Sequence, residues 1–262
     1  MSQYISPKKS LGQHFLMDPN IARKIAASLT GYGGYKHVLE IGPGTGMLSK
    51  YLIQHEDYQW TGLEVDGEAI AFLKNAYPAE EDRIIAGDFL RYDLHDFFGS
   101  EAFAVIGNFP YNISSQIVIR VLNFRKQIPE VVGMFQKELA LRIAAPPGSK
   151  TYGILSVLTR AFYDVKVLFH VDPHVFMPPP KVQSTVIRLI RKTPFFLECD
   201  ESLFFTVVRT AFNQRRKTLK NSLKGLPVQW DKIPGHFIKE RPEQLDVHDF
   251  VQIARNIKAG KA

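Results

Sequence analysis

The chain has 262 residues, of which 45% are hydrophobic and 23% are charged, with a formal net charge of +7. That length predicts a sizeable core in one large domain with a smaller one beside it. No run approaches the roughly 18 apolar residues that a membrane helix needs, and the amino terminus lacks the apolar stretch of a secretory signal. The single cysteine, Cys199, excludes an internal disulfide and a cysteine-based metal site. We therefore expect a cytoplasmic protein without a metal, whose positive charge is compatible with nucleic acid as a partner.

Short apolar or β-branched runs predict strands along the first two-thirds of the chain. They cover 37–42, 60–65, 83–88, 103–108, 130–136, 165–171 and 184–192. Near-continuous apolar runs are typical of strands buried on both faces. Helical patterns separate them at 47–54, 67–76 and 114–123. This alternation predicts an α/β fold with a doubly wound parallel sheet. The last two runs are joined without a helix, which indicates an antiparallel edge.

The pattern changes at about Thr193, where the β-branched runs stop. Apolar residues then recur at three- and four-residue steps, as they do in an amphipathic helix. They are Phe205, Val208, Phe212, Leu219 and Leu223. We expect one helix from Leu203 to Lys224 and two domains, at 1–192 and 193–262, the second small and all-α.

A glycine loop and two carboxylates follow the first three predicted strands. "EIGPGTG" places Gly42, Gly44 and Gly46 directly after the first strand, where missing side chains allow a tight turn and close approach of a ligand. The spacing is not that of the dinucleotide fingerprint. Glu64 ends the second strand and is suited to accept hydrogen bonds from ribose hydroxyls, and Asp88 ends the third and is suited to an adenine amine. Together they predict a site for an adenosine at the carboxyl edge of the sheet.

The fourth strand ends in "GNFPYNIS", residues 107–114. The side-chain oxygen of Asn108 and the carbonyl of Pro110 are both acceptors, and Tyr111 offers a flat face on which a base can stack. Acceptors that draw the hydrogens of an aromatic amine out of the ring plane favour a nitrogen with an available lone pair. We expect Phe109 to be a second exposed ring beside these polar groups. The motif therefore predicts methyl transfer to a purine amine.

With these motifs the chain resembles the ribosomal RNA adenine dimethyltransferases, in particular their bacterial small-subunit (16S) branch, over nearly its whole length. "KKSLGQHFL" is similar to the family's amino-terminal signature, "EIGPGTG" to its cofactor loop and "GNFPYNIS" to its catalytic motif. "VFMPPPKVQS" and "AFNQRRKTLKNSL" resemble later family segments. Two departures are Phe109, where many relatives have leucine, and His14, where relatives often have asparagine.

The resemblance implies a Rossmann-like class I methyltransferase domain with seven strands, the last antiparallel, and a helical domain after it. It implies S-adenosylmethionine as cofactor and N6,N6-dimethylation of two adjacent adenosines near the 3′ end of 16S rRNA, within the 30S subunit or its precursor. Asn108, Pro110 and Tyr111 would shape the target site, and Phe176, held out by the prolines that follow it, would stack on the target base from the opposite side. The implied cofactor contacts are His14, Leu16, Gly42, Gly44, Glu64, Asp88 and Asn108.

The predicted helix of the second domain carries only positive charges on its polar face, because no acidic residue lies between Val208 and Lys224. Such a face is typical of a phosphate-binding surface. The candidate RNA-binding residues are Arg209, Arg215, Arg216, Lys217 and Lys220. Lys8 and Lys9 are interpreted either as a second phosphate contact or as a basic tail.

Two other functions fit the same residues. One is a large-subunit (23S) rRNA adenine methyltransferase of the antibiotic-resistance type, which shares the cofactor loop and the catalytic motif. The other is an RNA-binding ribosome-assembly factor whose methylation is secondary. We expect a monomer, since no long exposed apolar stripe stands out.

Overall fold

The computed structural model describes residues 5–258, and its contacts divide the chain into two compact units. The first unit comprises Met1–Ala140 and Val165–Arg191, and the second comprises Leu141–Asp164 and Lys192–Ala262. The division differs from the expected single boundary after residue 192, because the chain leaves the first unit at residue 141 and returns at 165. The reason is that helix α7 (Ile154–Phe162) packs on α8 (Glu201–Asn213) and α10 (Val247–Arg255) of the carboxyl-terminal part.

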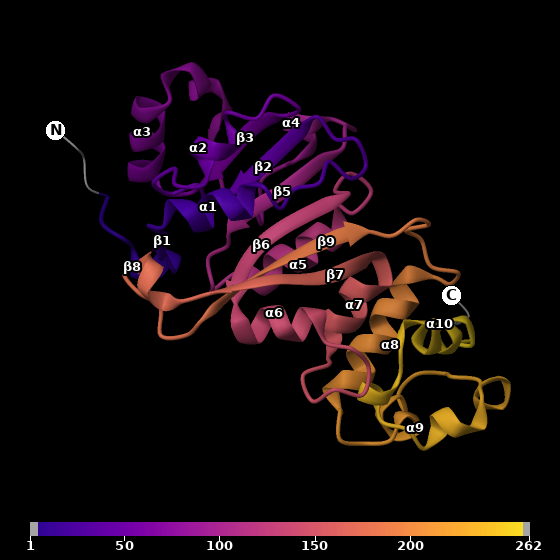
Figure 1. Ribbon diagram of the computed structural model, residues 1–262. Coiled ribbons are helices and arrows are strands. Elements are labelled where there is room, and N and C mark those ends of the chain that lie inside the picture. Colours follow the sequence, from indigo (N-terminus) through magenta and orange to yellow (C-terminus); the bar gives the residue numbers. More distant parts are fainter. Residues whose placement is uncertain (1–4, 259–262) are drawn as a thin grey trace. The chain divides into compact units, whose positions relative to one another are not determined.

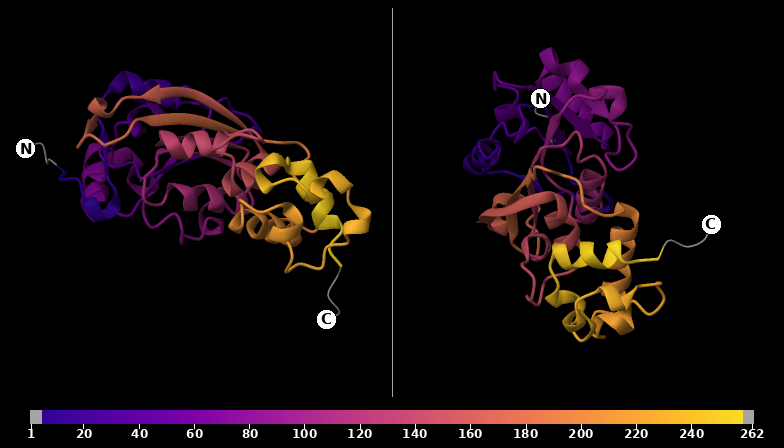
Figure 2. Two further views of the ribbon diagram at one scale, coloured as in Figure 1. Left: turned by 90° about the horizontal axis from the view of Figure 1, so that it is seen from below. Right: turned by 90° about the vertical axis from the view of Figure 1, so that its right-hand side faces the viewer.

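A seven-stranded sheet forms the first unit, with the strand order β4-β3-β2-β5-β6-β9-β7 (Figure 1). Strands β2 to β6 run parallel, and β9 pairs antiparallel with β6, so the predicted α/β doubly wound sheet with an antiparallel last strand is confirmed. The long strands β7 and β9 lie side by side in Figure 2. The strands are β2 (His37–Ile41), β3 (Gln59–Glu64), β4 (Ile84–Ala86), β5 (Phe103–Asn108), β6 (Glu130–Gln136), β7 (Tyr163–Val171) and β9 (Ser184–Arg191).

Helices connect the parallel strands, and acidic residues cap two of them. Asp18 accepts hydrogen bonds from the backbone N–H groups of Asn20 and Ile21 at the start of α1, and Asp66 accepts one from Glu68 at the start of α3. Carboxylates at these positions satisfy otherwise unpaired amides. The helices are α1 (Pro19–Ala26), α2 (Ser49–Leu52), α3 (Gly67–Ala76), α4 (His95–Phe98), α5 (Ser114–Asn123) and α6 (Lys137–Ala144), with 3-10 turns at Lys9–Leu11, Pro78–Arg83 and Pro173–Val175.

A separate two-stranded ribbon joins segments that are far apart in the sequence. Strand β1 (Phe15–Leu16) pairs antiparallel with β8 (Phe176–Met177), and the two lie side by side in Figure 1. The ribbon holds the amino-terminal segment against the proline-rich segment that begins at Pro178.

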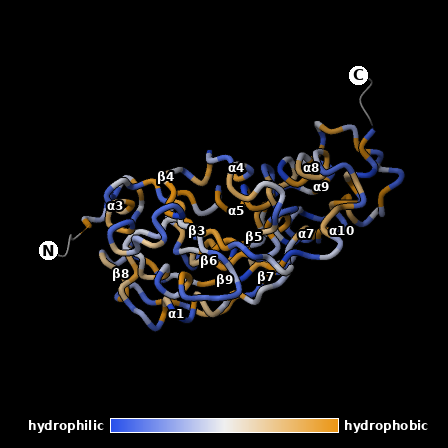
Figure 3. The backbone as a smooth tube through the Cα atoms, turned by 90° about the horizontal axis from the view of Figure 1, so that it is seen from above, coloured by the Kyte–Doolittle hydropathy of each residue, from blue (hydrophilic) through white to orange (hydrophobic). Residues whose placement is uncertain are grey.

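The strands form the core of the first unit. Figure 3 shows that hydrophobic residues follow one another along the central strands. On β5 and β6, Val105, Ile106 and Val132 are fully buried. One carboxyl group lies among them. Glu40 on β2 is 2% exposed and accepts hydrogen bonds from Ser49 Oγ (2.7 Å) and Trp60 Nε1 (2.8 Å). Burial raises the pKa of Glu40 to about 7, although these two hydrogen bonds act in the opposite direction.

We expect Glu40→Gln to stabilise the protein at alkaline pH. In the unfolded chain this carboxyl ionises at a lower pH, so the free energy of unfolding falls as pH rises from about 5 to above 7. Glutamine keeps an acceptor oxygen and cannot ionise, so the variant should gain roughly 2–3 kcal/mol over the parent at pH 8 and little at pH 5. Urea unfolding at both pH values measures this, with the exposed Glu56→Gln as control. If the free energies of unfolding of Glu40→Gln and the parent differ by the same amount at both pH values, the raised pKa of Glu40 is contradicted.

Apart from an isolated bridge between Val228 and Ile257 and the first two residues of β7, the described elements of the second unit are helices and short turns. Its helices are α7, α8 (Glu201–Asn213), α9 (Leu219–Ser222) and α10 (Val247–Arg255), with 3-10 turns at Trp230–Lys232, Gly235–Ile238 and Pro242–Gln244. The expected continuous helix from Leu203 to Lys224 is therefore wrong, because residues 214–218 interrupt it. The predicted apolar residues Val208 and Leu219 are nevertheless fully buried on the two shorter helices, and Leu223 is fully buried directly after the second of them.

Within residues 5–258, no helix is long and apolar enough to cross a bilayer. No group of three or more His, Cys, Asp or Glu side chains in that range is placed to hold a metal ion.

Candidate active site

A pocket lies at the carboxyl ends of β2, β3 and β5, the edge predicted from the sequence. The amino-terminal segment closes one side of it. Its lining residues are Leu11, Gly12, Gln13, His14, Phe15, Gly42, Gly44, Glu64, Val65, Asn108, Phe109, Pro110 and Tyr111. Of the predicted site residues, the pocket thus collects His14, Gly42, Gly44, Glu64, Asn108, Pro110 and Tyr111.

The glycine loop has the backbone conformation that the sequence predicted. Gly42 and Gly44 have positive φ angles of 66° and 57°, which residues with a side chain rarely adopt. At Gly44 a side chain would also lack space, since its Cβ would lie 2.9 Å from the ring of Phe15. A Cβ at Gly42 would lie 4.0 Å from the ring of Pro110 and within 4 Å of no other side chain among the described residues, so the loop leaves room on the side of the pocket.

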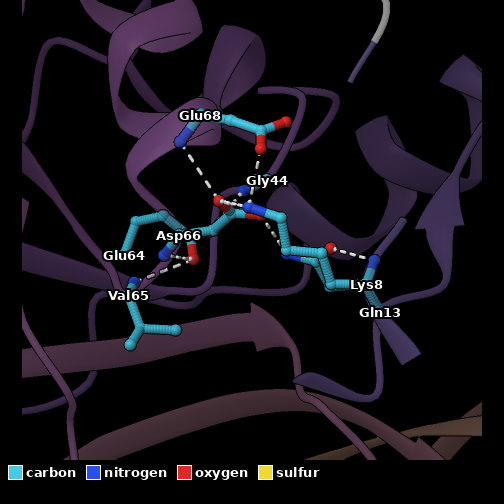
Figure 4. A network of polar contacts seen from close by, with 7 residues as sticks. All are labelled: Lys8, Gln13, Gly44, Glu64, Val65, Asp66 and Glu68. Atoms are coloured by element: carbon cyan, nitrogen blue, oxygen red, sulfur yellow. Dashed lines mark hydrogen bonds and ion pairs between the residues drawn. The ribbon is translucent and has the colours of Figure 1, made fainter. Parts of the chain in front are cut away.

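Glu64 holds this loop in place (Figure 4). Its side chain is buried, and Oε2 accepts a hydrogen bond from the backbone N–H of Gly44 at 3.0 Å. Oε1 accepts from the N–H groups of Val65 (2.8 Å) and Asp66 (3.0 Å). A carboxylate has about four acceptor positions, so one is left for a ligand hydroxyl. The role of Glu64 as a ribose acceptor remains a prediction.

Asn108 lies at the end of β5 with its amide oriented by the amino-terminal segment. Nδ2 donates a hydrogen bond to the carbonyl oxygen of His14 at 2.9 Å. The side-chain oxygen Oδ1 accepts no hydrogen bond from any described residue, so this acceptor is available in the pocket.

The carbonyl of Pro110 is not available in the same way. It accepts hydrogen bonds from Ser114 Oγ (2.7 Å) and from the N–H of Ile113 (3.2 Å), which occupy both of its lone pairs. The predicted use of this carbonyl as the second acceptor is therefore contradicted in this structure. The carbonyl of Phe109 accepts no hydrogen bond from the described residues.

Phe109 is among the residues that line the pocket, although the whole residue is only 1% exposed. The ring packs edge-on against Phe135, with 5.1 Å between centroids. It covers Gly107 and Gly133, where an added Cβ would lie 2.9 Å and 2.4 Å from ring carbons. The expectation that Phe109 is exposed is wrong, and its ring instead anchors the turn to the sheet.

Tyr111 is half-buried beside His14. Its hydroxyl lies 2.5 Å from Ser184 Oγ, and its ring centroid lies 5.4 Å from that of His14 at an interplanar angle of 30°. Burial raises the pKa of Tyr111, with the Ser184 contact acting in the opposite direction. The ring is therefore a neutral aromatic surface at the edge of the pocket.

Three predicted site residues lie outside the pocket lining. Phe176 is 3% exposed and packs in the core through the β1–β8 ribbon opposite Leu16, which is itself buried, so the expectation that Phe176 stands out as an aromatic wall is contradicted. Leu16 has its side chain in the same core cluster. Asp88 follows β4 by two residues, and its Oδ1 accepts a hydrogen bond from the N–H of Leu90 at 2.9 Å.

Sequence reasoning missed a network that holds the amino-terminal segment (Figure 4). Lys8 Nζ lies 2.6 Å from Asp66 Oδ1 and 3.0 Å from Glu68 Oε1, and Gln13 Nε2 donates to Asp66 Oδ2 at 3.0 Å. Hydrogen bonds to Asp66 and Glu68 raise the pKa of Lys8. Burial alone would raise the pKa of Asp66, but hydrogen bonds from Lys8 and Gln13 lower it below its ordinary value. Lys8 is thus neither a free phosphate contact nor part of a loose tail.

We expect Lys8→Met to release this segment from the pocket. Without the ion pairs, amide hydrogen exchange of residues 8–15 should become several-fold faster, because local opening no longer breaks those contacts. Lys9→Met is the matched control, since Lys9 is exposed and its side chain takes no part in the network. Equal exchange in the two variants would contradict the role of Lys8.

The candidate RNA-binding residues differ in their solvent exposure and in their contacts with the rest of the protein. Arg209, Arg216, Lys217 and Lys220 are exposed. Arg215 is half-buried, donates to the carbonyl of Lys150 at 2.7 Å and lies 3.7 Å from Glu243. These contacts within the second unit give Arg215 a structural role.

The fold agrees with solved methyltransferase structures. A dimethyladenosine transferase from Plasmodium falciparum covers 92% of this chain and 96% of its own length, with a TM-score of 0.75 and 26% identity. The 23S rRNA methyltransferase ErmE covers 92% of this chain and 99% of its own length, with a TM-score of 0.70 and 25% identity. The first unit thus has the Rossmann-like fold of methyltransferases.

Sequence comparisons then give the family. The model of the ribosomal RNA adenine dimethylase family matches residues 5–258. A ribosomal RNA small subunit methyltransferase A from Cytophaga hutchinsonii is 52% identical, covering 98% of this chain and 99% of the relative. One from Flavobacterium johnsoniae is 54% identical, covering 97% of each. The chain belongs to the ribosomal RNA adenine dimethylase family, as its motifs indicated.

Proposed function

We propose that this protein transfers methyl groups from S-adenosylmethionine to N6 of two adjacent adenosines near the 3′ end of 16S rRNA. The supporting observation is that one pocket combines the glycine loop and Glu64 with Asn108 in a chain that matches the family over residues 5–258. Relatives about half identical to this chain are named small-subunit enzymes, whereas the 23S enzyme is 25% identical, which favours the 16S substrate. We further propose that the protein acts as a cytoplasmic monomer on the 30S subunit or its precursor.

The pocket residues fit the proposed cofactor. The loop at Gly42 leaves space that a side chain would fill, and Glu64 retains an acceptor position for a ribose hydroxyl. We assign the cofactor to Gly42, Gly44, Glu64 and Asn108, with the backbone of His14 and Leu16 beside it. Asp88 is kept as the adenine contact. When bound, the cofactor supplies the methyl group and a sulfonium leaving group.

The chain's own contribution to the reaction is orientation of the target amine. Asn108 Oδ1 and the carbonyl of Phe109 accept no hydrogen bond from any described residue, and we assign both to the hydrogens of N6. Tyr111 supplies the stacking surface for the base, worth roughly 1–3 kcal/mol. Held in this way, the amine directs its lone pair at the methyl carbon, and alignment alone can supply about 7–11 kcal/mol of the barrier. Phe176 would have to leave its buried position to contact the base, so we assign it no role in this conformation.

Labelled-methyl transfer to purified subunits tests the proposal. We expect transfer to 30S particles that lack the modification, and mass spectrometry of the digested RNA should find N6,N6-dimethyladenosine at two adjacent positions. Transfer to 50S particles would support the 23S alternative instead. Tight binding to the 30S particle without transfer would support a pure assembly factor.

The exposed cations of the second unit provide a separate prediction for RNA binding. Replacing Arg216, Lys217 and Lys220 with glutamine removes three contacts to phosphate, so affinity for the 30S particle should fall. The slope of log affinity against log salt should decrease in magnitude by about 2, at roughly 0.7–0.9 per phosphate. Filter binding at several salt concentrations measures both quantities. An unchanged slope would mean that these side chains do not contact the RNA backbone.

A further inference from the structure

Arg120 on α5 holds the turn that follows β4. Its Nη1 donates a hydrogen bond to the carbonyl oxygen of Leu90 at 3.0 Å, and its Nη2 donates to the carbonyl oxygen of Tyr92. The planar guanidinium presents its donors in a rigid fork, which suits two carbonyls better than the single ammonium of a lysine does. One side chain thus fixes both ends of segment 90–92 from a helix that follows later in the chain.

Two aromatic rings hold the guanidinium itself. Its Cζ lies 4.9 Å from the ring centroid of Phe124 and 5.7 Å from that of Phe89, which are distances of cation–π contacts. Phe89 belongs to the same turn and is buried. Burial lowers the pKa of Arg120, and the charges of Asp88 and Asp93 act in the opposite direction. The guanidinium is therefore packed in place within electrostatic range of both carboxylates.

The same turn carries Asp88, the residue that we assign to the adenine amine. Asp88 Oδ1 accepts a hydrogen bond from the N–H of Leu90 at 2.9 Å. Its carbonyl oxygen accepts from the N–H groups of Arg91 (2.9 Å) and Tyr92 (2.8 Å). Oδ2 lies 3.9 Å from Arg91 Nε, beyond hydrogen-bond distance, so this oxygen keeps acceptor positions for a ligand. The direction of the carboxylate therefore depends on the position of the Leu90 amide, which belongs to the segment that Arg120 holds.

The turn also lies beside the residues of the pocket. The N–H of Gly87 donates to the carbonyl oxygen of Glu64 at 2.8 Å, and the ring of Tyr92 covers Gly87, where an added Cβ would lie 2.6 Å from a ring carbon. Helix α5 begins at the target site, since Ser114 Oγ donates to the carbonyl of Pro110 at 2.7 Å. This helix therefore contacts both the turn assigned to adenine and the turn assigned to the target amine.

We propose that Arg120 is a positioning residue for recognition of adenine, an inference that rests on the proposed function. By fixing the carbonyls of Leu90 and Tyr92, it directs Asp88 Oδ2 at the 6-amino group of the cofactor's base. Without the guanidinium the two carbonyls lose these bonds and turn toward water, and the carboxylate moves with the Leu90 amide. The pocket then still binds the ribose and the amino-acid part, and it loses its preference for a base that carries the amine.

Two ligands that differ only at this amine test the proposal. They are S-adenosylhomocysteine and its analogue with purine in place of adenine. In the parent, isothermal titration calorimetry should find the adenine ligand bound about 10–100-fold more tightly, the range for a hydrogen bond to a charged group. In Arg120→Met, an unbranched apolar side chain still packs against Phe89 and Phe124, and the preference should fall below about 3-fold. Affinity for the purine ligand should change little.

Three further measurements accompany this comparison. Arg23→Met, which replaces an exposed arginine on α1, is the matched control and should keep the preference of the parent. Arg120→Lys keeps the charge and offers no fork for two carbonyls, so its preference should lie between those of the parent and Arg120→Met. Without any ligand, amide hydrogen exchange at residues 89–92 should be several-fold faster in Arg120→Met, and exchange at the glycine loop 42–46 should not change.

A preference equal to that of the parent in either folded Arg120 variant would overturn the proposal. If the affinities for both ligands fall by the same factor, Arg120 is a structural contact and does not position Asp88. Equal binding of the two ligands by the parent would also overturn it, because the amine would then not be recognised. In each of these cases the parent still transfers labelled methyl groups to 30S particles. If it binds neither ligand and transfers no methyl group, the proposed function fails instead.

Discussion

Replacing Asn108 with alanine is expected to reduce methyl transfer to the 30S particle by at least ~100–1,000-fold, the loss typical of removing one oriented hydrogen-bonding group from a reacting centre. The variant lacks Oδ1, the acceptor that we assign to a hydrogen of the target amine. It also lacks the bond from Nδ2 to the His14 carbonyl, which joins the amino-terminal segment to this turn. Single-turnover transfer with labelled methyl groups measures the effect.

Binding of the same variant to the 30S particle should change little, since Asn108 is not among the exposed cations of the second unit. Asn20→Ala, an exposed asparagine on α1, is the matched control and should retain the parent rate. Transfer by Asn108→Ala above about one-tenth of the parent rate would show that the amide does not orient the amine. Loss of particle binding together with transfer would show that catalysis and recognition are not separable at this residue.

Phe109→Ala is expected to produce the largest loss of stability among the site variants. Phe109 is 1% exposed, and its ring fills the space over Gly107 and Gly133. Truncation to alanine therefore leaves a cavity against the face of the sheet. Deletions of this kind typically cost about 3–5 kcal/mol. Phe109→Leu refills most of the volume and should cost less than about 1.5 kcal/mol.

Urea unfolding of the three proteins measures these differences. Phe196→Ala is the control, because that ring is 64% exposed and its removal should change the free energy of unfolding by less than about 0.5 kcal/mol. Similar losses for Phe109→Ala and Phe196→Ala would contradict the packing role. Because the ring anchors the turn, Phe109→Ala should also lower methyl transfer at temperatures where the variant is still folded.

The sheet and the convergence of its loops could be predicted because they follow from local patterns. Strands buried on both faces need uninterrupted apolar runs, and each predicted run corresponds to a strand of the sheet within a few residues. The carboxyl ends of parallel strands meet at one edge. From that rule we could predict that Gly44, Glu64 and Asn108 lie in one pocket, although they are distant in the sequence.

The orientation of individual aromatic rings could not be predicted in the same way. Phe109 and Phe176 both stand beside polar or proline residues, and that pattern is the same whether a ring turns outward or inward. The space that decides the matter is provided by other strands. Gly133 on β6 leaves room for Phe109, and pairing of β8 with β1 draws Phe176 inward.

The break between α8 and α9 and the role of Lys8 likewise depend on contacts between distant residues. Arg215, in the turn that interrupts the helix, donates to the carbonyl of Lys150 and lies 3.7 Å from Glu243, and both of these residues are remote in sequence. The polar run at 213–217 contains no apolar residue that would hold a helix against the core. Lys8 is neutralised by Asp66, 58 positions away, a pairing that charge counting along the chain does not reveal.

A crystal structure with S-adenosylmethionine tests most directly whether one pocket serves both the methyl donor and the amine. We predict that the adenosine ribose contacts Glu64, that the amino-acid part lies along the glycine loop, and that the sulfonium methyl faces the turn where Asn108 Oδ1 and the Phe109 carbonyl are free. Density for the ligand at any other place, or a methyl group directed away from Asn108, would contradict this account.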